Sequence, residues 1–216
     1  MPEACSSANG TILGYDPGGD GTHGVAALEI QAGIPRAVKT GTLETAEAVI
    51  RFFTVQSDVL AIGLDTLTCW STGNAGWRPA DRWLRSQYPE VRNSVVSPNG
   101  LFGSMGLNGP AVLQEVRKSF PSLVVTETHP KVLYWVMAQE RYGYLQHQAK
   151  MEALLSREME ILLKTESEHA WDAAISALAA LRGYSGQWRN DLHCLPTEKS
   201  ERLVWPCGET HYFWPE

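Results

Sequence analysis

The sequence has no long hydrophobic run and few cysteines. No window approaches the ~20 apolar residues that a membrane helix requires, and no N-terminal apolar stretch resembles a signal peptide. We therefore expect a cytoplasmic protein that has no membrane partner. The four cysteines, Cys5, Cys69, Cys194 and Cys207, lack the spacing of a disulfide framework, so reduced thiols are the simplest expectation.

Positive charge is also scarce. The chain has 18 lysines and arginines against 24 aspartates and glutamates, a formal net charge of −6. This balance argues against a general nucleic-acid coat protein, which usually carries a basic surface. It does not exclude an enzyme that acts on nucleic acid, because acids gathered around metal ions make a chain acidic while cations neutralise the working site.

The length and composition are those of one soluble globular domain. With 216 residues, 44% of them hydrophobic and 19% charged, the chain can bury a good core. We expect a single domain over residues 1–216. Its core covers about 11–183, an elaborated insertion about 69–121 and a C-terminal tail about 184–216.

Apolar runs of strand length predict five core strands. In the first run, Ile12, Gly14 and Asp16 share one face. Leu13 and Tyr15 share the other face, and the glycines after this run are consistent with a hairpin. The predicted strands are Thr11–Asp16, Gly24–Ile30, Pro35–Leu43, Val59–Leu67 and Leu123–Thr128.

Helical periodicity fills the intervals between and after these strands. The last helix, "ESEHAWDAAISALAALRGY", is apolar around most of its circumference and ends near Gly183, so we expect it to be buried against the sheet. The order of elements predicts an α/β fold with a mixed sheet. The other predicted helices are "TLETAEAVIRFF" opening at Thr42 to Thr45, Pro79–Gln87, Pro110–Phe120, Pro130–Arg141 and Gln148–Leu163.

Acidic residues stand at the ends of several of these elements. Asp16 ends the first strand, Asp65 lies near the end of the fourth, and Glu127 lies near the end of the fifth. Asp172 sits in the first turns of the final helix, with His169 three residues earlier on the same face. Acids at neighbouring strand ends can converge on one point at the edge of an α/β sheet.

Converging carboxylates have a chemical consequence. They repel one another and raise each other's pKa unless cations share them. Mg²⁺ or Mn²⁺, hard ions that prefer oxygen ligands, fit that need, and two such ions ~4 Å apart can clamp the oxygens of a phosphodiester displacement. Any one of these acids taken alone is better explained as a solvated loop residue or a helix cap, but their placement as a set favours the metal site.

Here the sequence resembles the ribonuclease H-like superfamily, and more narrowly the predicted-nuclease family called domain of unknown function 429. The resemblance covers roughly residues 12–182 and implies an α/β, ribonuclease H-like fold: a mixed five-stranded sheet flanked by helices, with an elaborated insertion between strands 4 and 5. It implies a metal-dependent nuclease for DNA or RNA, and does not supply the substrate. The matching segments are "GYDPG", "IGLDTL", "WRPADRWLR", "TETHP" and "EHAWDAAISALAAL".

The resemblance also assigns roles to residues. "HAWDA" is similar to the His-x-x-Asp arrangement in the last helix of some RuvC-type nucleases, which implies metal binding by Asp16, Asp65 and Asp172. His169 would be a fourth ligand or a proton shuttle. Glu127 would assist from an "E-x-[YH]-P" motif that the narrower family carries. The implied cofactor is Mg²⁺ or Mn²⁺, the implied partner is nucleic acid of unknown type, and a homodimer is compatible with this interpretation.

Arg78, Arg82 and Arg85 form the only compact basic cluster and occupy one helix face. They can contact phosphates, which favour arginine for its bidentate geometry, or form a solvated basic face paired with Asp81. His129 can be either a hydrogen-bonded scaffold that orients Glu127 or a general base.

Two other functions remain open at this stage. The glycine-rich loop "DPGGDGT" resembles the first phosphate loop of actin-like ATPases and sugar kinases, but those enzymes need a second such domain, for which 216 residues leave no room. A non-catalytic scaffold that retains the fold is the other alternative, and clustered buried carboxylates without metal would be costly there. Zinc on His193, Cys194, Cys207 and His211 is disfavoured by their spacing.

Overall fold

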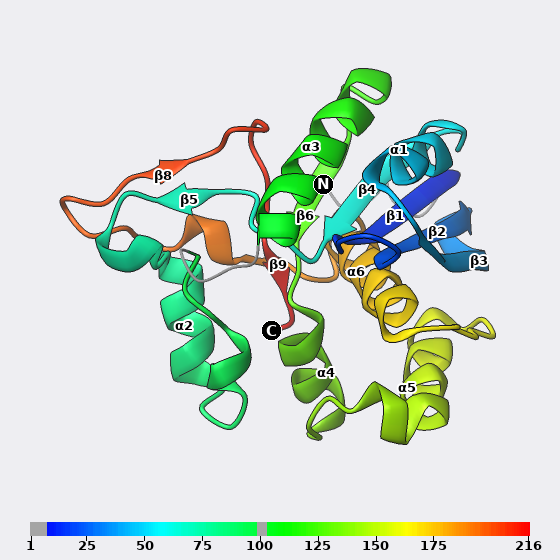
Figure 1. Ribbon diagram of the computed structural model, residues 1–216. Helices are drawn as coiled ribbons and strands as arrows, with labels where there is room; N and C mark the ends of the chain where they lie inside the picture. Colours follow the sequence, from blue (N-terminus) through cyan, green and yellow to red (C-terminus); the bar gives the residue numbers. More distant parts are fainter. Residues whose placement is uncertain (1–7, 99–102) are drawn as a thin grey trace.

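A five-stranded mixed sheet forms the centre of the computed structural model, which describes residues 8–98 and 103–216 (Figure 1). The strand order is β3-β2-β1-β4-β6, with the first three strands antiparallel and with β4 and β6 parallel to β1. This confirms the mixed α/β sheet and is consistent with a ribonuclease H-like fold. The strands are β1 (Gly10–Asp16), β2 (His23–Gln31), β3 (Ile34–Leu43), β4 (Val59–Leu64) and β6 (Val124–Glu127).

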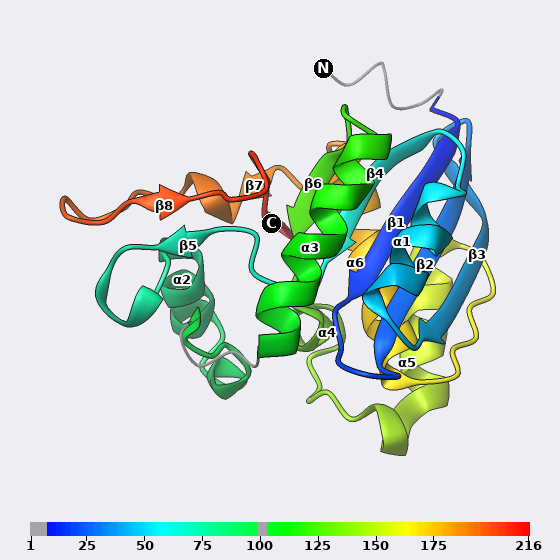
Figure 2. The same cartoon turned by 45° about the horizontal axis from the view of Figure 1, so that its top comes forward.

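Helices cover both faces of the sheet (Figures 1 and 2). On one face α6 (Glu168–Tyr184) packs across β1, β2 and β4, and it also contacts α4 (Pro130–Ala138) and α5 (Tyr144–Met159). On the other face α1 (Ala46–Thr54) packs against α3 (Gly103–Ser119). The sheet is therefore the middle layer of three.

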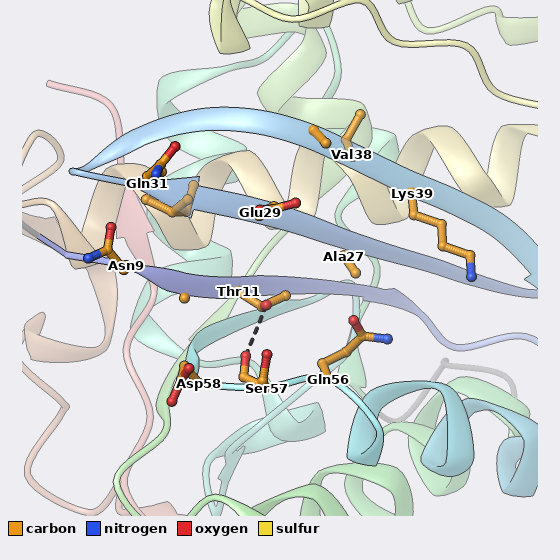
Figure 3. Close-up of a pocket in the computed structure, with 13 residues that line it drawn as sticks. Asn9, Thr11, Ala27, Glu29, Gln31, Val38, Lys39, Gln56, Ser57 and Asp58 are labelled. Atoms are coloured by element: carbon orange, nitrogen blue, oxygen red, sulfur yellow. Dashed lines mark hydrogen bonds between the residues drawn. The ribbon is translucent and has the colours of Figure 1, made fainter.

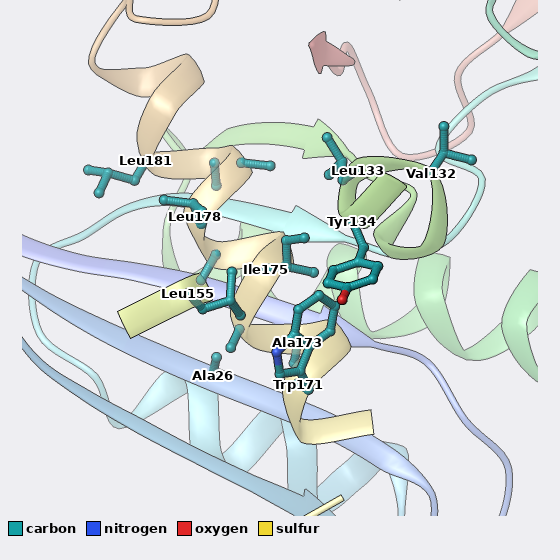
Figure 4. Close-up of a cluster of buried hydrophobic side chains, with 14 of the residues drawn as sticks. Ala26, Val132, Leu133, Tyr134, Leu155, Trp171, Ala173, Ile175, Leu178 and Leu181 are labelled. Atoms are coloured by element: carbon teal, nitrogen blue, oxygen red, sulfur yellow. The ribbon is translucent and has the colours of Figure 1, made fainter. Parts of the chain in front are cut away.

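Alternate residues of β1 face the two sides of the sheet, as the sequence predicts. Ile12 belongs to the buried cluster around α6, whereas Leu13 and Tyr15 belong to the cluster under α1 and α3. Figure 4 shows Trp171 of α6 against Tyr134 of α4, with ring centroids 5.7 Å apart in an edge-to-face arrangement. The helix that is apolar around most of its circumference is buried as expected, because neighbours surround it.

Glycines allow α6 to lie unusually close to the sheet. A Cβ at Gly14 would stand 1.9 Å from the carbonyl oxygen of Ala173, and one at Gly63 would stand 2.0 Å from that of Ser176. Gly14 and Gly63 are paired neighbours on β1 and β4. At these positions no side chain separates the sheet from the helix backbone. Short polar side chains on α6 can therefore reach the edge of the sheet.

Gly63→Ala is accordingly expected to destabilise the protein. The added methyl must push α6 outward, and overpacking of this kind typically costs about 1–3 kcal/mol. The urea midpoint measures the effect. Gly41→Ala in β3 is the matched control, because its nearest foreign atom, Oε1 of Glu166, would be 3.8 Å from the new Cβ. Equal midpoints for the two variants would contradict this account of how α6 is seated.

Between β4 and α3 the chain leaves the core and pairs with the C-terminal tail. β5 of this segment pairs with β8 of the tail, and within the tail β7 pairs with β9. Figure 2 shows this part of the chain extending to one side of the sheet. Its elements are β5 (Trp70–Ser71), η1 (Asn74–Gly76), α2 (Pro79–Gln87), η2 (Arg92–Ser94), β7 (Asn190–Asp191), η4 (Leu192–Cys194), β8 (Leu203–Val204) and β9 (Phe213–Trp214).

The predicted helix over Pro110–Phe120 starts earlier than expected. α3 begins at Gly103, and Pro110 lies inside it. Proline is common at the first position of a helix, which is why the sequence predicts a start at Pro110. Inside α3 its missing N–H removes one hydrogen bond, and the burial of Val112 and Val116 against the sheet stabilises the helix despite this loss. α3 belongs to the core, so the segment outside the core is shorter than the predicted insertion of about 69–121.

Other predicted boundaries also shift. The helix predicted over Gln148–Leu163 begins at Tyr144 and ends at Met159, because Glu160 takes a left-handed backbone conformation with φ of 55°. The strand predicted over Val59–Leu67 ends at Leu64, because the chain turns away from the sheet after the parallel pairing with β6. The helix predicted over Pro130–Arg141 ends at Ala138, where Gln139 takes a left-handed backbone conformation with φ of 55°. Helices that end in this way usually have glycine at this position. Here the residue is glutamine, so no glycine marks the helix end in the sequence.

Within the described part of the chain, no helix has the length and apolar character needed to cross a membrane. Cys69, Cys194 and Cys207 are free thiols, and Cys5 lies outside the described residues.

Candidate metal centre

Strand pairing places two of the predicted acids side by side. Tyr15 and Leu64 are partners in the parallel pairing of β1 with β4, and the N–H of Asp65 donates to the carbonyl of Tyr15 at 2.9 Å. Asp16, the last residue of β1, and Asp65, the first residue after β4, therefore stand at equivalent positions. Each acid also comes two residues after a glycine that α6 covers, so both side chains face the helix.

The third acid reaches the same point from α6. Carboxylate oxygens of Asp16, Asp65 and Asp172 all lie within 4.8 Å of one another. Asp16 and Asp172 are 6% and 5% exposed, while Asp65 is half-buried and gives the group its contact with solvent. Three residues spread over most of the chain thus make one compact acidic cluster.

The electrostatics of this acidic cluster are unfavourable without a cation. Burial raises the pKa of all three carboxyl groups, and the charge of Asp16 raises the pKa of Asp65 and Asp172 further. The hydrogen bond and charge of His169 relieve Asp16 in part. A metal-free cluster therefore tends to retain protons that free carboxyl groups would lose.

Two further side chains hold the carboxylates in place. Nδ1 of His169 donates to Oδ2 of Asp16 at 2.6 Å, and this bond raises the pKa of the imidazole. The hydroxyl of Tyr142 donates to Oδ1 of Asp172 at 2.8 Å. Tyr142 lies between α4 and α5 in the segment "RYGY", where no spacing pattern distinguishes it. Whether His169 is a ligand or a proton shuttle stays a prediction.

The donor set fits a hard divalent cation. All three groups offer carboxylate oxygens, which Mg²⁺ and Mn²⁺ prefer. Over residues 8–98 and 103–216, no lysine or arginine forms an ion pair with Asp16, Asp65 or Asp172, and His169 is the one basic side chain that forms a hydrogen bond to them. The negative charge of the cluster is thus left largely uncompensated by the chain itself.

Glu127, which we expected to assist at this site, does not join the three acids. It pairs with Leu64 across β4 and β6, one position before Asp65, so its side chain faces the opposite side of the sheet. There Glu127 accepts hydrogen bonds from Arg78 and from the backbone and hydroxyl of Thr68. The expected catalytic role of Glu127 does not fit these contacts.

Arg78 is the buried cation that neutralises Glu127. Its side chain is 2% exposed, and its Nη2 atom lies 2.5 Å from Oε1 of Glu127 and 2.7 Å from Oδ1 of Asp81. Burial alone would raise the pKa of Glu127, but Arg78 and His193 lower it to about 2. Arg78 therefore ties α2 to the end of β6, and its predicted contact with substrate phosphate does not fit its burial.

Arg82 and Arg85 also have partners within the protein. Arg82 forms an ion pair with Glu201 at 2.6 Å, and Arg85 donates to the carbonyls of Arg92 and Val95 at 2.7 Å each. Both keep some exposed surface, so phosphate contact by these two arginines stays a prediction.

A second group of side chains that could bind a metal consists of Glu127, Cys69 and His193. The guanidinium of Arg78 already contacts Glu127 and lies 3.7 Å from the sulfur of Cys69, so a cation occupies this position. The zinc ligands considered above do not gather: within the described residues, Cys194, Cys207 and His211 belong to neither close group of metal-ligand side chains.

One large cavity lies far from the acidic cluster. It measures about 690 Å³ and lies at the other end of β1, beside Thr11, Glu29 and Lys39 (Figure 3). Thr11 donates there to the carbonyl of Ser57 at 3.1 Å. No group of converging acids lines it. A smaller cavity of about 210 Å³ is bordered by Asp65 and so adjoins the acidic cluster.

No protein-family model matches the chain, and no curated protein matches it. Among solved structures, RuvC of Thermus thermophilus is similar at 12% identity, over 82% of this chain and 96% of that chain, with a TM-score of 0.42. At 12% identity the two chains share few side chains, so the role of each residue here is inferred from its own contacts.

Proposed function

We propose that this chain is a metal-dependent nuclease of the ribonuclease H-like superfamily that hydrolyses phosphodiester bonds of DNA or RNA. Membership of the narrower family of predicted nucleases, domain of unknown function 429, is part of this proposal. The observation that carries it is the convergence of Asp16, Asp65 and Asp172 to within 4.8 Å, without a lysine or arginine paired to them in the described residues.

Asp16, Asp65 and Asp172 would hold the ions. When bound, Mg²⁺ or Mn²⁺ supplies an activated water and neutralises the charge that develops on the phosphate oxygens. The cluster suits this chemistry because it is recessed yet open at Asp65. Such a site excludes bulk water from the ligands while leaving one side for a large substrate.

The neighbouring side chains would set orientation and move protons. The hydrogen bond from Nδ1 of His169 fixes the carboxylate of Asp16, and the bond from Tyr142 fixes that of Asp172. The imidazole of His169 is 33% exposed. Its Nε2 atom is therefore available to exchange a proton with the leaving group or with solvent.

A cleavage assay tests this function. The purified protein is incubated with labelled single-stranded, duplex, hybrid and branched oligonucleotides in Mn²⁺, in Mg²⁺ and in excess EDTA. We expect cleavage of at least one substrate with metal and none with EDTA, because water alone is a poor nucleophile toward a phosphodiester. Cleavage that is unaffected by EDTA, or cleavage of no substrate with either metal, would contradict the proposal.

A further inference from the structure

The cavity beside the acidic cluster has a mixed lining. Val95, Val96 and Met105 give it an apolar wall, and Asp65 is shared with the cluster. Its volume of about 210 Å³ is below the ~300 Å³ at which pockets for drug-sized ligands begin. A cavity of this size has room for one heterocyclic ring system but not for a base pair.

His129, which also lines this cavity, has a buried and unpartnered ring nitrogen. Nε2 of His129 lies 3.1 Å from the carbonyl oxygen of Ser94, which can only accept, so Nε2 carries the ring hydrogen. Nδ1 is therefore a bare acceptor, and it is buried without a hydrogen-bond partner in the described residues. Burial lowers the pKa of His129 to about 4, which keeps the ring neutral at pH 7. Within the described residues His129 makes no hydrogen bond to Glu127, so the predicted scaffold role does not match these contacts, and the role of general base stays a prediction.

A basic side chain, that of Lys131, also lines the cavity. Lys131 lines both this cavity and a second hollow of about 360 Å³ that Arg141 and Tyr142 also line. Lys131 is exposed, its Nζ is 5.5 Å from the ring centroid of Tyr142, and within the described residues it has no ion-pair partner. Lys131 and Asp65 of the acidic cluster line the same cavity.

We propose that the cavity of Val95, Val96 and Met105 receives one unpaired nucleobase of a single-stranded nucleic acid, while Lys131 binds the adjoining phosphate. This inference rests on the proposed function and narrows its substrate class. The base would pack on the apolar wall, beside the ring of His129. Its phosphodiester would then lie between Lys131 and Asp65, next to the acidic cluster.

A regular duplex fits this site poorly. Its bases are stacked and paired, so one of them would have to flip out at a cost of a few kcal/mol before it could enter the cavity. A single strand has no such cost, and contacts between bases and side chains can then add to the phosphate contacts. The cavity thus favours strands or junction ends with an unpaired base.

Binding can be measured apart from cleavage. Fluorescence anisotropy in Ca²⁺ compares the full-length protein on a single strand, on its duplex, and on a series of strands that each lack one base. We expect the single strand to bind at least about 10-fold more tightly than the duplex. Loss of a base should weaken binding at one position of the series and have little effect elsewhere.

Substitutions locate the binding site. Met105→Trp and Val96→Trp fill the cavity and should weaken single-strand binding about 10-fold, whereas Leu107→Trp, on the same helix and 72% exposed, should not. Lys131→Ala should lower the slope of log K against log salt by about 0.7, as expected for one lost phosphate contact on a single strand. Lys118→Ala is the control for Lys131, since Lys118 is exposed and paired with Glu115.

The outcomes separate the two proposals. Equal affinity for single strand and duplex, equal effects at every missing base, or wild-type binding by both tryptophan variants would overturn the base site. Position-dependent binding without any cleavage in Mn²⁺ would instead uphold the base site and overturn the nuclease function.

Discussion

Asp172→Asn is expected to reduce metal-dependent cleavage by more than about 100-fold, since even partners outside the ligand shell typically contribute 10- to 100-fold. The substitution keeps the shape of the side chain, and its amide oxygen can still accept the hydrogen bond from Tyr142. It removes one of the three negative charges that converge to within 4.8 Å. A loss of cleavage in this variant is therefore due to the missing charge and not to a change of fold.

The same variant should change thermal stability in opposite directions with and without metal. An ion at 100 times its Kd stabilises the folded state by about 2.7 kcal/mol. For a chain of this size that corresponds to a rise of about 5–10 °C in Tm. The wild-type protein should show such a rise with Mn²⁺, and Asp172→Asn should not. Without metal the variant should be the more stable of the two.

The sign of the metal-free effect follows from the direction of the pKa shifts. The folded state raises the pKa of Asp16, Asp65 and Asp172, so it holds protons that the unfolded chain releases. Stability is then lost as pH rises from the unfolded value of about 3.9 through the folded pKa. Neutral pH lies above the unfolded value, so the metal-free cluster costs stability there, and replacing one acid by an amide removes part of that cost.

Asp58→Asn is the matched control for these measurements. Asp58 precedes β4, at the end of the strand opposite to Asp65, and has a φ of 49°, a conformation that asparagine tolerates well. The Asp58→Asn variant should cleave nucleic acid and respond to Mn²⁺ as the wild-type protein does. A full Mn²⁺-dependent rise in Tm for Asp172→Asn would contradict metal binding at the acidic cluster.

The convergence of the acids was predictable because the relevant pattern is local. In "GYD" and "GLD" each acid follows a glycine by two residues, so acid and glycine share the face that α6 covers. "VTE" at the end of β6 has Val125 in the position of the glycine. Val125 is buried in the core under α1 and α3, and Glu127 points to that same side. The alternation of side chains along these strands is therefore enough to predict that Glu127 faces the other side of the sheet from Asp16 and Asp65.

The partners of the acids were not predictable in this way. Lys131 lies in α4, and Tyr142 lies in the turn after it. The positions of both side chains depend on how α4 packs against α6. Arg78 looked like a surface cation because it stands in a charged helix with Arg82 and Arg85. Its burial follows from the return of the C-terminal tail over the segment after β4, a contact between residues more than 100 positions apart.

Arg78→Met is expected to destabilise the protein by about 3–5 kcal/mol, as removal of one partner from a buried ion pair typically does. The substitution leaves Glu127 and Asp81 buried without the cation that both contact. For a chain of this size the loss corresponds to a fall in Tm of about 6–20 °C. Chemical unfolding gives the free energy, and Arg189→Met on the exposed surface should change it little.

The double variant Arg78→Met/Glu127→Gln distinguishes a structural ion pair from a substrate contact. If Arg78 serves to neutralise Glu127, the second substitution removes the uncompensated charge, and the double variant should be more stable than Arg78→Met alone. If Arg78 instead bound phosphate, Arg78→Met would keep its stability and lose nucleic-acid affinity. Because the guanidinium is 2% exposed and contacts two carboxylates, we expect the recovery of stability.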